Sequence, residues 1–122
     1  MRRIAFITIA AAAALVVAAT ALSATILSDP TSPTQLAYAK KRLTATHGLV
    51  TLRSKNMSSV LSHNIAIRKG ITATGKVLAK GKIVSKGSVS KFTVKLPKGK
   101  YRFFCSVPGH EQGGMWGILT VK

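Results

Sequence analysis

The last part of the chain, Tyr101 to Lys122, carries soft-metal donor atoms at regular spacing. It contains the single cysteine, one of the three histidines and one of the three methionines, and Cys105, His110 and Met115 follow a C-x4-H-x4-M pattern. Apolar residues alternate with other residues before Cys105 and after Met115, which predicts a strand on each side. Proline and glycine residues between them predict a tight loop. A thiol, an imidazole and a thioether are therefore expected in one loop between two strands.

This set of donor atoms indicates a copper site. Cysteine and methionine sulfur suit copper, and imidazole also binds it. A second imidazole would complete such a site, and His63 is the candidate. It shares strand parity with Ile65 and Ile67, so its ring is expected to point inward. A lone inward histidine is more often a core residue with one hydrogen bond, but the C-terminal pattern favours a metal ligand.

The first residues of the chain differ in composition from the rest. Two arginines precede an apolar run from Ile4 to Leu22, and Ala19 and Ala21 form the small-x-small pattern that signal peptidase recognises. We interpret residues 1–23 as a signal peptide or, because about 20 apolar residues span a bilayer, as a membrane anchor. The protein is therefore expected to be exported and extracytoplasmic, in a periplasmic, cell-surface or secreted location.

The remainder of the chain is interpreted as a linker followed by one domain. Residues 24–33 are predicted to be a polar linker, and residues 34–122 are predicted to be the copper-binding domain. Glycines interrupt the domain every few residues, and short apolar alternations lie between them. Many short strands separated by turns predict an antiparallel β-sandwich or barrel.

Together these features resemble the cupredoxins, the small blue copper proteins of the plastocyanin, halocyanin and azurin type. The similarity covers roughly residues 34–122, and it implies that Gln35 to Tyr38 form the first strand of the domain. It depends on the His63-Asn64 pair, on the G-x-Y-x-F-x-C pattern that ends at Cys105, and on the C-x4-H-x4-M loop. The resemblance implies an all-β fold, an antiparallel Greek-key β-sandwich or barrel of the cupredoxin type.

The resemblance also implies a ligand set for one type 1 copper ion. His63, Cys105 and His110 would bind the ion in a near-trigonal plane, with Met115 as the long axial ligand. Asn64 is expected to tie its strand to the cysteine loop and to tune the sulfur, because residues around a metal site usually support its ligands. The alternative for Asn64 is an ordinary polar residue of an edge strand.

A site of this kind predicts a single-electron carrier. Four protein ligands that suit both Cu(I) and Cu(II) leave no position for a substrate, so the chain is not expected to be an enzyme. Asp29 and Glu111 are the only carboxylates among the side chains, which excludes paired-carboxylate catalysis. Glu111 is expected to be solvated. Two alternatives are a copper carrier or storage module, and a cationic module that binds polyanions without a redox role.

The chain is strongly basic, with 19 lysines and arginines, two acidic residues and a formal net charge of +17. This charge predicts steering toward redox partners with acidic docking surfaces, or toward an anionic membrane surface. Nucleic acid is disfavoured because aromatic residues are scarce and no recognition motif is present. We expect a monomer that docks its partner around His110. The predicted docking residues are Val107, Pro108, Gly109, Gly114 and Trp116.

Overall fold

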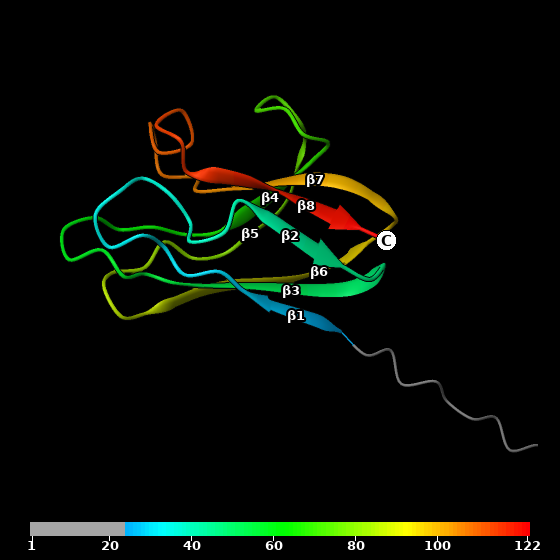
Figure 1. The fold of residues 1–122 in the computed structure, drawn as a ribbon, viewed down its shortest axis with the longest axis horizontal. Helices are drawn as coiled ribbons and strands as arrows, with labels where there is room; N and C mark the ends of the chain where they lie inside the picture. The colour runs from blue at the N-terminus through cyan, green and yellow to red at the C-terminus, as the bar shows by residue number, and fades with distance from the viewer. Residues whose placement is uncertain (1–23) are drawn as a thin grey trace, which may run out of the picture.

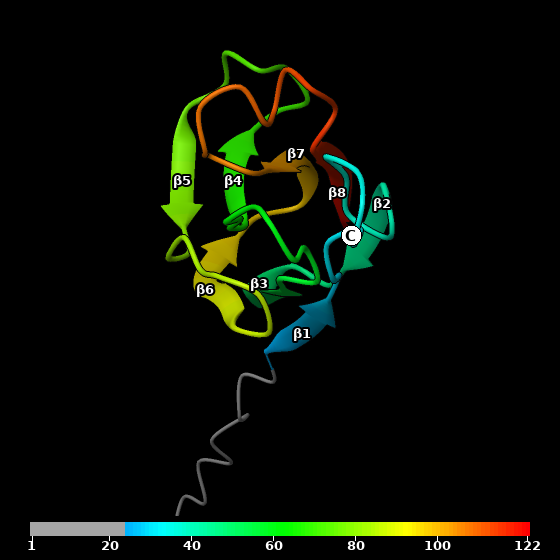
Figure 2. The same ribbon diagram turned by 90° about the vertical axis from the view of Figure 1, so that its left-hand side faces the viewer.

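A computed structural model describes residues 24–122, which form a β-sandwich (Figure 1, Figure 2). The predicted signal peptide or anchor, residues 1–23, lies outside the described residues. Residues 24–122 contain eight strands and no helix, so none of the described elements is a helix that could cross a membrane. The strands are β1 Thr25–Ser28, β2 Arg42–Ala45, β3 Gly48–Lys55, β4 Ala66–Lys69, β5 Val77–Lys80, β6 Val89–Leu96, β7 Gly99–Phe104 and β8 Trp116–Val121.

The strands form two sheets, with the orders β1-β3-β6 and β2-β8-β7-β4-β5. This arrangement confirms the predicted all-β sandwich. The sheets are mixed, however, and not wholly antiparallel: β1 pairs with β3, and β2 with β8, in parallel. The reason is that β1, β2 and β3 alternate between the two sheets. The chain crosses from β1 to β2 in the other sheet and then crosses back, so β3 runs beside β1 in the same direction. Parallel strands need a crossover connection of this kind.

Alternating side chains place the core between the two sheets. In β6, Phe92 and Leu96 are buried whereas Lys91 and Lys95 are exposed, as expected for a strand with one covered face. Phe92 is paired with Leu52 of β3 in the register of the antiparallel ladder. The fully buried core side chains include Val50, Leu52, Ile65, Ile67, Phe103 and Leu119.

The N-terminal boundary of the folded region differs from the predicted one. Strand β1 lies within residues 24–33, which were expected to be a polar linker, and it pairs along β3. The pairing continues past β1, because the N–H groups of Asp29 and Thr31 donate to the carbonyls of Arg53 and Lys55 at 2.9 and 3.0 Å. The linker prediction is wrong for this segment. Strand β1 is held at the sheet edge by these backbone hydrogen bonds and by Leu27, which packs against the core.

Residues Gln35 to Tyr38 are not the first strand. They are a series of bends that ends in an isolated bridge between Tyr38 and Thr31. Tyr38 is nevertheless buried, and its ring packs edge-to-face on Phe103 with centroids 5.3 Å apart. Its O–H donates to the carbonyl of Asn64 at 2.6 Å. One side chain thus secures this segment, where a ladder of backbone hydrogen bonds was expected.

Asp29 is a buried carboxylate just after β1. Its Oδ1 accepts a hydrogen bond from the backbone N–H of Lys40 at 2.8 Å, and its Oδ2 has no hydrogen-bond partner. Burial raises the pKa of the Asp29 carboxyl above its ordinary value of 3.8, and the hydrogen bond and charge of Lys40 oppose this only in part. Ionised Asp29 therefore costs the folded state free energy at neutral pH.

Replacing Asp29 by asparagine is expected to change how stability depends on pH. The folded-state pKa of Asp29 lies above the unfolded one, so the contribution of Asp29 to stability is fully present below pH 3.8 and is lost as the pH rises through the folded-state pKa. Asn does not titrate. The unfolding free energy of Asp29→Asn minus that of wild type should thus increase as the pH rises. The total increase should be about 1.4 kcal/mol for each unit by which folding raises the pKa of Asp29. Urea unfolding between pH 3 and 7 measures this, and a pH-independent difference would contradict it.

The predicted ligand positions lie at one end of the sandwich. Cys105, His110 and Met115 belong to the connection between β7 and β8, and His63 lies shortly before β4. Figure 1 shows the β7–β8 connection, in orange, at the end of the sandwich away from the C-terminus. Strands β4 and β7 are neighbours in the five-stranded sheet. This adjacency brings His63 and Cys105 together although they are far apart in the sequence.

Candidate metal centre

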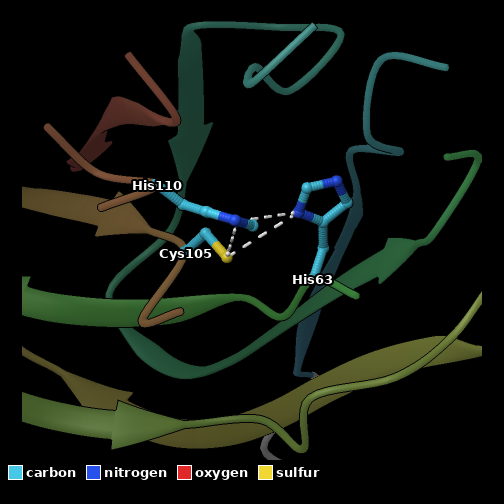
Figure 3. Close-up of side chains that lie close together, drawn as sticks. All are labelled: His63, Cys105 and His110. Carbon is cyan, nitrogen blue, oxygen red and sulfur yellow. Dashed lines mark hydrogen bonds between the residues drawn. The ribbon is translucent and has the colours of Figure 1, made fainter. Parts of the chain in front are cut away.

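Three side chains converge at this end of the sandwich (Figure 3). The Nδ1 atoms of His63 and His110 are 3.2 Å apart, and Sγ of Cys105 lies 3.9 Å from the first and 3.6 Å from the second. Nitrogen ligands lie about 2.0–2.1 Å and thiolate sulfur about 2.3 Å from a bound metal such as zinc, so donor atoms that share an ion are roughly 3–4 Å apart. The three donor atoms are therefore spaced to hold one ion.

The ring of His63 makes its polar contacts through the nitrogen that faces the other two side chains. His63 and Cys105 are buried and His110 is half-buried. The Nε2 atom of His63 is buried without a hydrogen-bond partner, so all polar contacts of this ring are made by Nδ1. Two imidazole nitrogens and one thiol sulfur are donor types that suit copper. The residues present therefore fit a copper ion.

The pKa shifts of His63 and Cys105 favour a neutral imidazole at His63 and a protonated thiol at Cys105 until a metal binds. Burial lowers the pKa of His63, and the charge of His110 lowers it further. Burial raises the pKa of the Cys105 thiol, while hydrogen bonds from the backbone of Asn64 and Val107 act in the opposite direction. Metal binding deprotonates a cysteine ligand. Loading the site is therefore expected to release a proton from Cys105.

The loop that carries His110 and Met115 is closed by its own backbone hydrogen bonds. The N–H of Cys105 donates to the carbonyl of Met115 at 3.1 Å, and the N–H of Met115 donates to the carbonyl of His110 at 3.0 Å. Gly109 and Gly114 have φ values of 83° and 113°, in the left-handed region that glycine enters without a Cβ penalty. The C-x4-H-x4-M pattern thus corresponds to one compact loop that closes on itself.

Met115 is fully buried and belongs to the hydrophobic core cluster. Its backbone contacts with Cys105 and His110 place it next to the converging side chains. A buried thioether beside two imidazoles and a thiol is consistent with the predicted axial position. Its role as a ligand stays a prediction.

His63 is positioned by the connection between β3 and β4. Its backbone forms an isolated bridge with Val84, with N–H to O distances of 3.1 and 2.9 Å. The side-chain amide of Asn56 donates to the carbonyls of Leu61 and Val84 at 2.9 and 2.8 Å, which ties the His63 loop to the segment beside it. Asn56 is buried and was not singled out from the sequence. Its only signal there is an asparagine directly after a strand, where turns are common.

Asn64 joins two loops next to the candidate ligands. Its Nδ2 donates to Oγ of Ser106 at 2.7 Å and to the carbonyl of Gly81 at 3.0 Å. Its Oδ1 accepts the backbone N–H of Ser106 at 2.7 Å. Since Ser106 follows Cys105, the side chain of Asn64 links the segment of His63 to the cysteine loop. The role of Asn64 in tuning the sulfur stays a prediction.

Replacing Asn64 by alanine is expected to destabilise the protein by about 1–3 kcal/mol. The reason is that the change leaves buried hydrogen-bonding groups of Ser106 and Gly81 without a partner, each at a desolvation cost. Ser106→Ala is the matched control, since it removes one of these hydrogen bonds but keeps the asparagine. Denaturant unfolding of the metal-free protein measures both. Equal stability of Asn64→Ala and wild type would show that this link carries little of the loop's stability.

The predicted docking residues lie at or near the surface. Pro108 and Gly109 are exposed, and Val107 and Gly114 are half-buried. Trp116 is 37% exposed and its ring lies 3.9 Å from the guanidinium carbon of Arg102. These residues flank half-buried His110 in the same connection. Their accessibility is compatible with docking, and the docking role stays a prediction.

Glu111 is not solvated, which corrects the sequence interpretation. It is buried and forms ion pairs of 2.9 Å with Arg68 and 2.7 Å with Arg102. Burial by itself raises the pKa of the Glu111 carboxyl, but hydrogen bonds and charges of the two arginines outweigh it and hold that pKa below its ordinary value. Arg68 and Arg102 are opposite each other on β4 and β7. Like charges in that position repel each other, and the carboxylate of Glu111 between them offsets this repulsion.

Sequence and fold comparisons agree on the class of protein. The sequence profile of the family described as copper binding proteins, plastocyanin/azurin family, matches residues 26–122. Reduced auracyanin from Roseiflexus castenholzii is 30% identical with a TM-score of 0.71, and the match covers 84% of this chain and 99% of that one. Auracyanin A from Chloroflexus aurantiacus, described as a blue copper protein, is 26% identical with a TM-score of 0.71 and coverage of 82% and 100%.

Rusticyanin from Thiobacillus ferrooxidans shares the fold at 18% identity, with a TM-score of 0.66 and coverage of 81% of this chain and 77% of that one. No curated protein matches the chain significantly. The two-sheet fold and the cluster of one cysteine and two histidines define a small copper protein of the blue type. The chain belongs to the plastocyanin/azurin family of copper-binding proteins, the cupredoxins, and copper is its cofactor.

Proposed function

We propose that this protein is a single-electron carrier in which His63, Cys105, His110 and Met115 hold one type 1 copper ion. The observation that carries the proposal is the convergence of two Nδ1 atoms and one Sγ atom in a largely buried site. The ion would supply one-electron chemistry by cycling between Cu(I) and Cu(II). The fold would supply the fixed positions of the donor atoms.

The residues around the site support electron transfer over catalysis on a bound substrate. Burial of His63 and Cys105 keeps water and small molecules away from two of the donor atoms. Backbone hydrogen bonds from Asn64 and Val107 offset part of the burial cost of a Cys105 thiolate. His110 is the one half-buried member of the cluster, so its ring is the route by which an electron would reach a partner.

The charge distribution supports a partner with an acidic docking surface. Both carboxylic side chains of the chain, Asp29 and Glu111, are buried, so the surface of residues 24–122 presents basic side chains without acidic ones. Such a surface attracts an acidic partner at long range, and the attraction weakens as salt screens it. The association rate with an acidic redox partner is therefore expected to fall steeply with ionic strength.

Export of the protein belongs to the same proposal. The apolar run from Ile4 to Leu22, with Ala19 and Ala21 in the small-x-small pattern, supports an extracytoplasmic location, either free or anchored at the membrane. A single-electron carrier with a net positive charge would there meet redox partners or anionic lipid headgroups. Fractionation of cells followed by mass determination of the mature N-terminus distinguishes cleavage from anchoring.

Two other functions receive less support from the site. A copper carrier would hand over its ion, whereas Cys105 and His63 are buried and held by several hydrogen bonds. A cationic polyanion-binding module would account for the charge, but it would not require a cysteine and two histidines with converging donor atoms. The electron carrier accounts for both features.

Titration of the full-length protein with Cu(II), followed by visible absorption and electron paramagnetic resonance, tests the proposal. We expect one equivalent of copper to produce an intense thiolate-to-copper absorption band and a narrow copper hyperfine splitting. His47→Gln is a matched control, because His47 is an exposed histidine bonded to the carbonyl of Lys122 and lies outside the cluster. Weak binding without the band, or loss of the band in His47→Gln, would overturn the ligand assignment.

A further inference from the structure

A buried ion cluster connects the segments that carry three of the four proposed ligands. Glu111 accepts hydrogen bonds from Nη2 and Nε of Arg68 at 2.9 and 3.3 Å, and from Nε of Arg102 at 2.7 Å. The side chains of Arg68, Arg102 and Glu111 are 18%, 10% and 7% exposed, respectively. These three residues form the ion cluster. Forked contacts between a guanidinium and a carboxylate, such as those from Arg68 to Glu111, are strongly directional.

Each member of the cluster either is a direct sequence neighbour of a proposed ligand or contacts such a neighbour. Glu111 directly follows His110. The guanidinium carbon of Arg68 lies 4.1 Å from the ring centroid of Phe104, which precedes Cys105. The guanidinium carbon of Arg102 lies 3.9 Å from the ring centroid of Trp116, which follows Met115. One connected set of contacts therefore reaches the neighbours of Cys105, His110 and Met115 at the same time.

The two arginines are themselves fixed on the sheet. Arg68 on β4 and Arg102 on β7 are opposite each other in the antiparallel register. Arg68 Nη1 donates to the carbonyl of Gly75 at 3.0 Å, and Arg102 Nη1 to that of Ile71 at 3.3 Å. The cluster thus joins the strand framework to the loop. A loop secured only by its own turns would lack this connection.

We propose that Arg68, Arg102 and Glu111 are positioning residues that hold the loop of His110 and Met115 in one arrangement against β4 and β7, so that the donor atoms stay in place with or without copper. The inference rests on the proposed function for its copper consequence, but the contacts that carry it do not involve the metal. A site whose supporting side chains are locked keeps its ligands within a narrow range of positions. Loss of the cluster should loosen the loop before it loosens the sandwich.

The test compares Glu111→Gln with Gln112→Lys in the full-length protein. Both substitutions raise the net charge by one, but the second adds it at an exposed position next to the cluster. Hydrogen exchange of the metal-free proteins is the first readout. In Glu111→Gln the loop amides of His110, Gly113 and Met115 should exchange at least about tenfold faster, because a broken buried ion network leaves charges unpaired and favours local opening. Amides of the β3–β6 ladder should be unaffected, and Gln112→Lys should match wild type.

Copper loading gives a second readout that a purely structural role would not move. In Glu111→Gln the absorption maxima and the copper hyperfine splitting should differ from wild type, while Gln112→Lys should keep the wild-type spectra. If Glu111→Gln does not fold, Arg68→Lys is the second variant. Lysine keeps the charge, but its single ammonium group cannot make the forked contact with Glu111 and at the same time donate to the carbonyl of Gly75. The same acceleration of loop amides is then expected.

Two results would overturn the proposal. One is wild-type exchange of the loop amides in the cluster variant, and the other is equal acceleration of loop and β3–β6 amides, which would mean a general loss of stability. If the wild-type protein itself gave no blue copper band, the proposed function would fail. The exchange measurement on the metal-free protein would still decide whether the ion cluster holds the loop.

Discussion

Replacing Cys105 by serine is expected to abolish the visible copper band and most of the stability that copper adds to the fold. A ligand that binds only the folded state stabilises it by about 4 kcal/mol when its free concentration is a thousand times the dissociation constant. Serine lacks the soft sulfur donor that copper prefers, so binding and the linked stabilisation should both fall. Unfolding by urea with and without Cu(I), under anaerobic conditions, measures the stabilisation.

The matched control for this prediction is the third histidine of the chain. His47 bonds to the carbonyl of Lys122 through Nδ1 and is not one of the converging metal-ligand candidates, so His47→Gln should keep the full response to copper. The metal-free Cys105→Ser protein should remain folded, since serine is smaller than the cysteine it replaces and Asn64 and Ser106 keep their contacts. An undiminished stabilisation by copper in Cys105→Ser would show that copper binds elsewhere.

Replacing Gly117 by alanine is expected to destabilise the fold by about 3 kcal/mol, the upper end of the usual cost of overpacking a core. Gly117 is opposite Phe103 in the β7–β8 ladder. A Cβ at this position would overlap the ring of Phe103 and lie 2.7 Å from the carbonyl oxygen of Lys41. Phe103 cannot yield easily, because it is fully buried and packs on Tyr38, whose O–H bonds Asn64 beside the metal centre.

A double-mutant cycle with Phe103→Leu tests this explanation. Leucine lacks the ring atoms that the new methyl group would overlap, so Gly117→Ala should cost less in the Phe103→Leu background than in wild type. Urea unfolding of the four metal-free proteins gives the coupling free energy. Additive effects would place the cost of Gly117→Ala outside the contact with Phe103, for example at the carbonyl of Lys41.

The elements that were predictable from the sequence are those with short-range patterns. Alternation in β6 and the run that ends at Cys105 predicted strands, because a residue's side of a strand depends only on its parity. The C-x4-H-x4-M spacing predicted a loop with its donor atoms grouped, since that loop closes on itself through local hydrogen bonds. Assigning His63 as a ligand required one further inference, namely that an inward-pointing histidine would lie next to this loop.

The missed elements depend on partners that are distant in the sequence. Strand β1 forms because the edge of β3 offers unpaired backbone groups and because Leu27 packs against the core. Residues Gln35 to Tyr38 form bends, and the segment is secured by the contacts of Tyr38 with Phe103 and Asn64, both distant in the sequence. Burial of Glu111 follows from Arg68 and Arg102 facing each other across β4 and β7. A single sequence does not reveal that register.

The sequence by itself determined which donor atoms are present, the alternation that makes the strands, and the family to which the chain belongs. Only the tertiary structure decided that His63 and Cys105, 42 positions apart, bring their donor atoms to one point, and that Glu111 is enclosed by two arginines. The physical reason is the range of the interactions. Strand parity and loop spacing are properties of neighbouring residues, whereas the register between β4 and β7 is set by the packing of the whole sandwich.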